Sequence, residues 1–155
     1  MIKNCMKRNV ISVPTDATVQ EAAELVVAHH IGQLPVVDQT GRLVGIVDLQ
    51  DILSLELPDF FDLLPNVDFV HDFGAVESTR PSKEELSRPI ISLARQATSV
   101  PETCGLLRAY AVMVKHDLHD IPVVTESGRL VGIASRVDLG TAILSLWKDT
   151  DSEEP

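Results

Sequence analysis

The stretch HHIGQLPVVDQTGRLVGIVDLQDI at residues 29–52 decides the fold, because it returns as HDLHDIPVVTESGRLVGIASRVDL at residues 116–139. The two copies lie 87 residues apart. The same offset holds upstream, where Arg8 recurs as Arg95 and the Ser-Val-Pro of residues 12–14 recurs at 99–101. A duplicated unit of this size predicts two copies of one fold, packed with approximate two-fold symmetry around two related clefts.

Length and charge narrow the class of protein. At 155 residues with 45% hydrophobic side chains, the chain can bury the core of one compact domain or of two small ones. The net charge of -10 argues against nucleic-acid and anionic membrane partners, which need Lys and Arg. No apolar run approaches the roughly 18 residues of a membrane span, and no signal peptide is recognisable. Cys5 and Cys104 fit free thiols, so we expect a cytoplasmic protein.

Each copy is expected to form a strand, a helix, two strands and a second helix. In the first copy, residues 10–13 are a short β-rich run that Pro14 ends. Thr18 and Glu21 form the capping-box pattern that starts a helix. A buried strand at 34–37, a turn at 38–41, a strand at 42–47 and a helix from about Leu49 follow. The last helix is predicted at about 136–147. The fold class is therefore α/β (α+β), with two βαββα repeats.

These elements divide the chain into a first repeat at 1–56, an insert at 57–92, a second repeat at 93–148 and a flexible acidic tail at 149–155. The insert holds all four phenylalanines, Phe60, Phe61, Phe69 and Phe73, among many acidic residues. A bare flexible linker would be poor in aromatic residues, so part of the insert is expected to dock on a surface. It either covers exposed core edges of the repeats or forms a lid that binds a partner.

The strings LPVVDQTGRLVGIVDLQDIL and IPVVTESGRLVGIASRVDL closely resemble the cystathionine-β-synthase (CBS) domain, whose tandem pairs are called Bateman modules. The resemblance covers about residues 6–56 and 93–147. It implies a βαββα fold, head-to-tail pairing of two copies and often a homodimer. Many members bind AMP, ATP or S-adenosylmethionine between the repeats and report the energy state of the cell to a partner enzyme or transporter.

The second repeat carries the Gly-x-x-Ser/Thr-x-x-Asp signature of nucleotide-binding members, as GIASRVD at residues 132–138. Ser135 would open a helix whose N–H groups and dipole favour phosphate, and Arg136 would bind phosphate oxygens. Asp138 would accept hydrogen bonds from the ribose hydroxyls. Alternatively, Ser135 is only a helix cap and Asp138 only a first-turn carboxylate. The resemblance implies further nucleotide-binding positions at Thr98, Ser99, Val100, Ile121, Pro122 and His116.

The first repeat departs from the signature, because GIVDLQD at residues 45–51 places Asp48 where the hydroxyl belongs. A phosphate at ~4 Å from Asp48 would be repelled by around 4 kcal/mol at an effective dielectric constant of 20. We therefore expect this cleft to be empty, or to take a neutral adenosine-like group or a metal-bridged phosphate. The residues of this degraded second site would be Asp48, Asp51, Ile11, His29, Leu34 and Pro35.

The histidines allow two interpretations. His29 and His116 hold equivalent positions, at which some nucleotide-binding members use a histidine to contact phosphate. A histidine that ends a helix also complements the negative end of the helix dipole, and the two interpretations stay open. The histidines and cysteines lack the ligand spacing of a zinc site, so no metal site is predicted.

The predicted function is regulatory rather than catalytic. The chain has no Gly-x-Ser-x-Gly elbow, no phosphate loop and no His-Glu-x-x-His motif, and it needs no covalent cofactor. An adenine nucleotide (AMP, ADP or ATP) would bind at the second repeat and signal to an unidentified target protein. The alternatives are a ligand-free dimeric scaffold and a sensor of S-adenosylmethionine or another adenosyl compound. A homodimer is expected through the second helices, at Ile52, Leu53, Leu55, Ile143, Leu146 and Trp147.

Overall fold

The two repeats form two three-stranded sheets in the computed structural model, which describes residues 1–57, 61–66, 68, 73–74 and 80–148. The strands are β1 (Val13–Pro14), β2 (Gln33–Val37), β3 (Leu43–Asp48), β4 (Val100–Pro101), β5 (Asp120–Val124) and β6 (Leu130–Ser135). β1 runs parallel to β2, β2 runs antiparallel to β3, and the second sheet repeats this order. Equivalent residues pair in both sheets, since Val13 lies opposite Val36 and Val100 opposite Val123.

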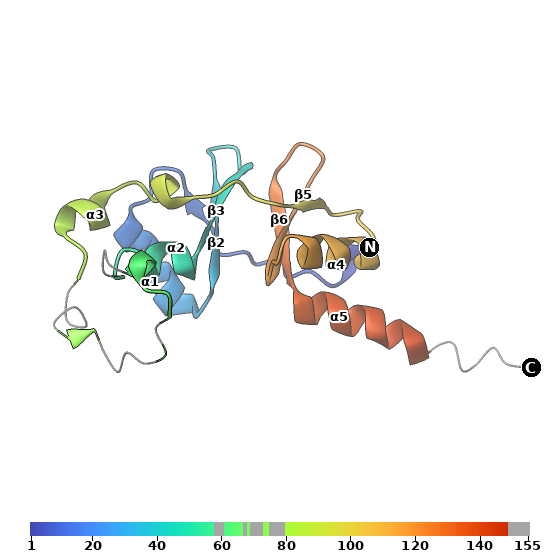
Figure 1. Cartoon of the computed structure of the whole chain (residues 1–155). Coiled ribbons are helices and arrows are strands. Elements are labelled where there is room, and N and C mark those ends of the chain that lie inside the picture. The colour runs from blue at the N-terminus through green and yellow to red at the C-terminus, as the bar shows by residue number, and fades with distance from the viewer. Residues whose placement is uncertain (58–60, 67, 69–72, 75–79, 149–155) are drawn as a thin grey trace, which may run out of the picture.

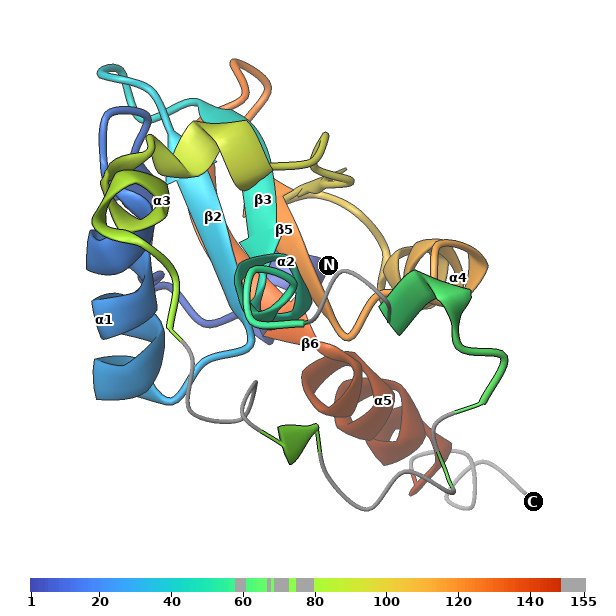
Figure 2. The same cartoon turned by 60° about the vertical axis from the view of Figure 1, so that its left-hand side comes forward.

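The helices cover the outer sides of the two sheets. They are α1 (Val19–His29), α2 (Leu49–Leu53), α3 (Lys83–Ser87), α4 (Leu106–Lys115) and α5 (Arg136–Ser145). Figures 1 and 2 show the sheets next to each other in the middle, with α1, α2 and α3 on one side and α4 and α5 on the other. The mixed α+β class and the two βαββα repeats are thus confirmed.

The tips of the two hairpins join the repeats symmetrically. The N–H of Leu43 donates to the carbonyl of Gly128, and the N–H of Leu130 donates to the carbonyl of Gly41, each at 3.0 Å. Both glycines have positive φ angles, 85° and 86°, as tight turns of this kind require. These reciprocal bonds are what approximate two-fold symmetry predicts.

Helix α1 begins where the sequence predicts. The hydroxyl oxygen of Thr18 accepts the N–H of Glu21 at 3.1 Å, and the Glu21 carboxylate accepts the N–H of Thr18 at 3.3 Å. This capping box satisfies two N–H groups that the helix itself leaves unpaired. The buried side of the helix carries Val19, Ala22 and Val26.

The first strand is shorter than predicted and lies further along the chain. Residues 10–12 are outside β1, whereas Pro14 is inside it. β1 is an edge strand, where a missing N–H need not break the hydrogen-bond ladder. Val10 and Ile11 instead line a cavity between the repeats. The last helix also ends earlier than predicted, since α5 ends at Ser145.

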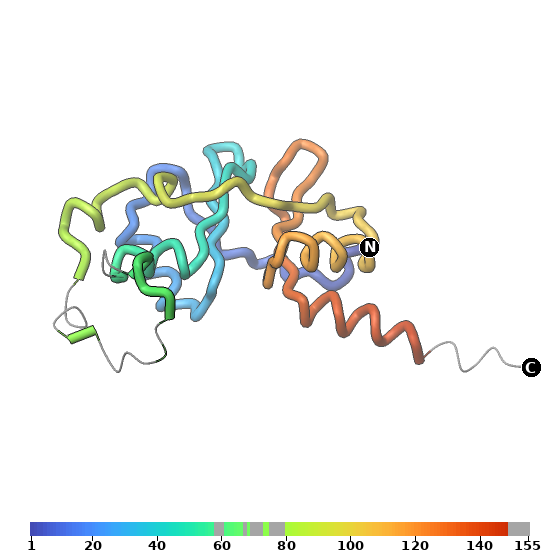
Figure 3. The backbone as a smooth tube through the Cα atoms, in the orientation of Figure 1, coloured from blue at the N-terminus to red at the C-terminus, as the bar shows by residue number. Residues whose placement is uncertain are grey.

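The N-terminal segment packs on the second repeat rather than on the first. Ile2 is fully buried in the second core together with Met6, and its N–H donates to the carbonyl of Cys104 at 2.8 Å. Lys7 then exchanges two backbone hydrogen bonds with Ile133 of β6, at 2.8 and 3.0 Å. Figure 3 shows the chain starting beside α4 and crossing to the first repeat. The first residues thus complete the core of the other repeat.

The segment before the second repeat makes the reciprocal crossing. Ile90 is fully buried in the first core, and Arg95 exchanges backbone hydrogen bonds with Ile46 of β3 at 2.9 and 3.0 Å. Because Ile46 and Ile133 are equivalent, Lys7 holds the place of Arg95. The spatial correspondence, Lys7 with Arg95, therefore differs by one residue from the sequence offset of 87, which relates Arg8 to Arg95.

Each crossing passes over a glycine. A Cβ on Gly132 would lie 2.8 Å from Cγ of Met6 and 3.1 Å from the carbonyl oxygen of Lys7. A Cβ on Gly45 would lie 3.1 Å from Cβ of Ala94. The glycine of each Gly-Ile pair in the repeated sequence thus makes room for the exchanged segment.

Part of the insert docks on the first repeat, as expected. Leu86 packs against the first core, and Ser82 caps α3 by accepting the N–H of Glu85 at 3.2 Å. Phe61 and Phe73 are among the described residues, whereas Phe60, Phe69 and the predicted tail at 149–155 lie outside them. In the described part of the chain, no helix is long and apolar enough to cross a membrane.

Candidate functional site

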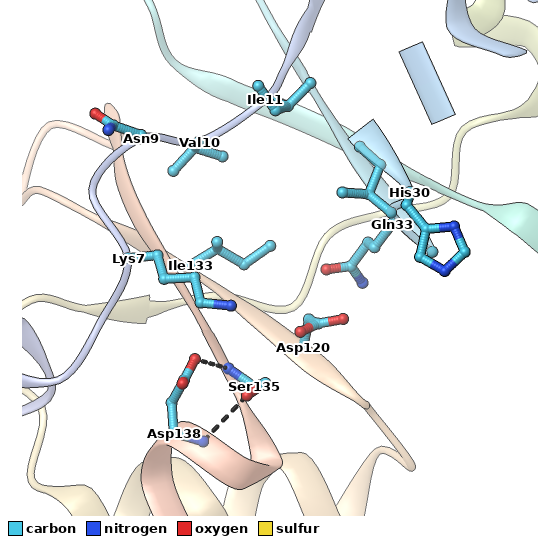
Figure 4. Close-up of a pocket in the computed structure, with 12 residues that line it drawn as sticks. Lys7, Asn9, Val10, Ile11, His30, Gln33, Asp120, Ile133, Ser135 and Asp138 are labelled. Carbon is cyan, nitrogen blue, oxygen red and sulfur yellow. Dashed lines mark hydrogen bonds between the residues drawn. The ribbon is translucent and has the colours of Figure 1, made fainter. Parts of the chain in front are cut away.

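Ser135 and Asp138 meet at the N-terminus of α5, beside a cavity of about 280 Å³ between the repeats (Figure 4). The hydroxyl oxygen of Ser135 accepts the N–H of Asp138 at 3.0 Å, and Oδ2 of Asp138 accepts the N–H of Ser135 at 2.9 Å. This capping box begins the helix and holds the carboxylate at the cavity. The capping role of the two residues is thus compatible with a place in a binding site.

We call this cavity the Asp138 cleft. Its side opposite Asp138 belongs to the first repeat. Val10, Ile11, Ile31 and Gly32 line it, together with Ile133 of β6. The first repeat also contributes polar side chains, those of Asn9, His30 and Gln33. An apolar surface with polar groups placed around it is typical of small-molecule sites. Ile11 was predicted for the other cleft, and the structure places it here.

The other predicted nucleotide-binding residues do not reach the Asp138 cleft. Val100 and Ile121 are buried in the second core, and Ser99 lines a hollow near the hairpins. The remaining three line a second cavity of about 160 Å³ beside Asp48: Thr98, His116 and Pro122.

The crossings explain this regrouping. Residues 9–11 follow the bridge between Lys7 and β6, so they come to line the same cavity as Ser135 of the second repeat. Residues 96–98 follow the bridge between Arg95 and β3, so they come to lie near Asp48 of the first repeat. The residues predicted for each site share one repeat, whereas each cleft combines residues of the two repeats.

Arg136 does not line the Asp138 cleft. Its Nη2 donates to Oδ1 of Asp117 at 3.1 Å, and its Nε donates to the carbonyl of Leu118. Lys7 lines the cleft instead, although it was not among the residues predicted from the sequence. The sequence repeat matches Arg95 with Arg8. In the structure, the residue at the position that corresponds to Arg95 is Lys7, one residue earlier.

Asp120 adds a second carboxylate to the cleft. It begins β5 opposite Ser135, and it lines both this cavity and a neighbouring one of about 360 Å³. Partial burial raises the pKa of Asp120, Lys7 and His119 oppose this rise, and the carboxylates of Asp138 and Asp48 add to it. The negative charge of Asp120 is therefore poorly stabilised by its surroundings. Asp120 was not predicted as a site residue, because it lies outside the signature.

Asp51 of the first repeat is equivalent to Asp138, and it is paired with a cation. Nε of Arg95 donates to Oδ1 of Asp51 at 2.8 Å, and the N–H of Asp48 donates to Oδ2 of Asp51 at 2.9 Å. The hydrogen bond to Asp51 raises the pKa of the Arg95 guanidinium. We call the cavity beside Asp48 and Arg95 the Asp51 cleft. The two clefts thus differ in whether the signature aspartate is bound by an arginine.

The remaining residues predicted for the second site are not in the Asp51 cleft. Leu34 and Pro35 are buried within β2, and His29 is exposed at the end of α1. The next residue, His30, has a φ angle of 52° and lines the Asp138 cleft. Across the described residues, no group of three or more His, Cys, Asp or Glu side chains is arranged to hold a metal ion.

Known proteins share this sequence pattern and fold. Residues 2–57 and 86–145 match the CBS domain. A homoserine O-acetyltransferase from Methanocorpusculum labreanum is 29% identical over 132 residues, which are 85% of this chain and 22% of that enzyme. The chain therefore spans about a fifth of the length of this curated relative.

Two solved structures have the same fold over nearly the whole chain. CBSX2, solved in complex with AMP, has a TM-score of 0.70 at 23% identity, covering 94% of this chain and 96% of that one. The CBS domain pair of protein MJ0100 was solved in complex with 5′-methylthioadenosine and S-adenosylmethionine. It has a TM-score of 0.67 at 20% identity, again covering 94% of this chain and 96% of that one.

Proposed function

This chain belongs to the CBS domain family, with two copies of the domain, and on that premise we propose that it is a regulatory module for an adenosyl ligand. Proteins of this family are generally regulatory and non-catalytic. The adenosine part of an adenine nucleotide, or of a related adenosyl compound, would occupy the Asp138 cleft. Binding would favour one arrangement of the two repeats and so change the affinity for a separate target protein.

The observation that carries this proposal is a fixed carboxylate facing an apolar surface across one cavity. Asp138 would accept hydrogen bonds from both ribose hydroxyls, and adenine would pack between Ile11 and Ile133. The cavity of about 280 Å³ is close to the lower end, roughly 300 Å³, of small-molecule sites. The adenosyl ligands of CBSX2 and of MJ0100 support this ligand class, because both proteins share the fold.

Filling each cleft in turn tests the assignment. We expect Ile11→Trp to abolish binding of adenosyl compounds, since the indole would occupy the space proposed for adenine. The equivalent residue of the second repeat, Thr98, lines the Asp51 cleft, so Thr98→Trp is a matched control that should leave binding unchanged. Isothermal titration with AMP and S-adenosylmethionine measures both variants, and thermal melts check that they fold. Loss of binding in Thr98→Trp alone would contradict the assignment.

The two clefts are proposed to be unequal, with one ligand per chain. In the Asp51 cleft, Arg95 takes the carboxylate that ribose would need, and Asp48 repels phosphate. We expect Arg95→Ala to create a second, weaker site for uncharged adenosyl compounds, because it releases Asp51. Titration with adenosine should then approach two sites per chain.

Arg8→Ala is the control for this experiment, because Arg8 is the sequence equivalent of Arg95 but donates to the carbonyl of Lys3 at 3.3 Å. It should leave the number of sites at one. Two equal sites in the unmodified protein would contradict the proposed inequality.

A homodimer and a protein partner remain part of the proposal. Leu53, Leu146 and Trp147 of the predicted dimer surface are 49%, 58% and 66% exposed, whereas Ile52 and Leu55 pack against the first core. Exposed apolar side chains at, or just beyond, the ends of α2 and α5 favour contact with a second copy. Sedimentation equilibrium at the monomer mass of 16.9 kDa would refute the dimer.

A further inference from the structure

The 5′ substituent of an adenosyl ligand in the Asp138 cleft would meet Asp120. With ribose on Asp138 and adenine on the apolar side, that substituent is left with the polar part of the lining. This part includes Lys7, Gln33 and Asp120, and Figure 4 shows all three around the same space. The chemistry of the 5′ substituent is therefore decided by these side chains, provided that the proposed function holds.

The side-chain carboxylates around Asp120 disfavour phosphate. Two carboxylates, Asp120 and Asp138, line the cleft, against one ammonium, that of Lys7, and the imidazole of His30. The guanidinium of Arg136 is bound to Asp117 and to a backbone carbonyl outside the cleft. Partial burial already raises the pKa of Asp120, so an added anion would destabilise its charge further. A nearby cation would stabilise the same charge.

We propose that the Asp138 cleft selects adenosyl compounds with a positive charge next to the ribose, as in a sulfonium, over nucleotides with phosphate there. The Asp120 carboxylate faces the sulfonium, and Lys7 binds a carboxylate at the outer end of the ligand. S-Adenosylmethionine carries its sulfonium next to the ribose and a carboxylate, together with an ammonium, at its outer end. 5′-Methylthioadenosine has the same adenosine and sulfur without the charge, and AMP has phosphate in its place.

Titration of these three ligands against the unmodified protein and Asp120→Asn tests the proposal. The unmodified protein should bind S-adenosylmethionine at least about ten-fold more tightly than AMP, with 5′-methylthioadenosine between them. In Asp120→Asn, affinity should fall about ten-fold for S-adenosylmethionine, rise about ten-fold for AMP, and stay within about three-fold for 5′-methylthioadenosine.

Two controls separate local charge from net charge and from misfolding. Asp16→Asn changes the net charge equally at an exposed residue, and it should change none of the three affinities. Because the pKa of Asp120 is raised on folding, its ionised form costs stability as the pH rises above the ordinary value of 3.8. Asp120→Asn should therefore melt no lower than the unmodified protein at pH 7.

The outcomes distinguish this inference from the proposed function. If none of the three compounds binds the unmodified protein, the proposed function fails, and this inference fails with it. If 5′-methylthioadenosine binds but AMP binds at least as tightly as S-adenosylmethionine, the proposed function stands and the selection by charge is refuted. Equal changes for all three ligands in Asp120→Asn would also refute it.

Discussion

Asp138→Asn should abolish measurable binding of every adenosyl compound, with a loss of about 100-fold or more in affinity. A carboxylate can accept hydrogen bonds from both ribose hydroxyls, whereas an amide offers one oxygen and presents N–H groups beside it. Hydrogen bonds to charged groups contribute about 1.5–3 kcal/mol each, so losing two of them accounts for this effect. Isothermal titration with S-adenosylmethionine, 5′-methylthioadenosine and AMP measures the loss.

Asp51→Asn is the matched control, because Asp51 holds the same position of the first repeat and is paired with Arg95. It should leave the affinity unchanged. Asparagine keeps an oxygen that can accept the N–H of Ser135, so α5 should still be capped in Asp138→Asn. If Asp51→Asn lost binding while Asp138→Asn kept it, the ligand would have to bind in the Asp51 cleft rather than in the Asp138 cleft.

Ile2→Ala should lower the free energy of unfolding by about 2–5 kcal/mol, which is the range for truncating a buried isoleucine. Ile2 is 0% exposed and lies in the core of the second repeat, although it precedes the first repeat in sequence. A domain has only about 5–15 kcal/mol of stability in total, so this is a large effect for an N-terminal residue. Denaturant unfolding followed by circular dichroism measures it.

Two further variants show whether the crossing is responsible. Lys3→Ala changes an exposed neighbour in the same segment and should stay within about 0.5 kcal/mol. Ile90→Ala removes the corresponding side chain of the reciprocal crossing and should cost as much as Ile2→Ala. If Ile2→Ala behaved like Lys3→Ala, the N-terminal segment would not complete the second core in solution.

Much of the fold could be predicted because its signals are local. The Thr18–Glu21 capping box predicts the start of α1, and the two glycine-containing turns predict the hairpins. The first strand was misplaced because residues 10–12 are β-rich yet lie between the repeats. Amino-acid preference does not distinguish a buried strand from an apolar segment that lines a cleft.

The candidate site could be predicted only in part. Asp138 was identifiable because the signature that contains it is contiguous and begins a helix. Lys7 and Asp120 were not, since both lie outside the signature. The side-chain partners of Arg136 and Arg95 were not predictable either. They depend on contacts between residues up to 44 positions apart in the chain.

The sequence by itself determined that this protein has two CBS repeats, and that the second carries the intact Ser135–Asp138 signature. Both properties are written in contiguous residues and in their repetition. Only the tertiary structure decided which residues face Asp138. The segment that precedes the first strand of each repeat packs on the other repeat, so residues of both repeats line each cleft. It also decided that Arg95 binds Asp51 while Lys7 and Asp120 line the cleft of Asp138, since charges far apart in sequence meet only when the sheets pack.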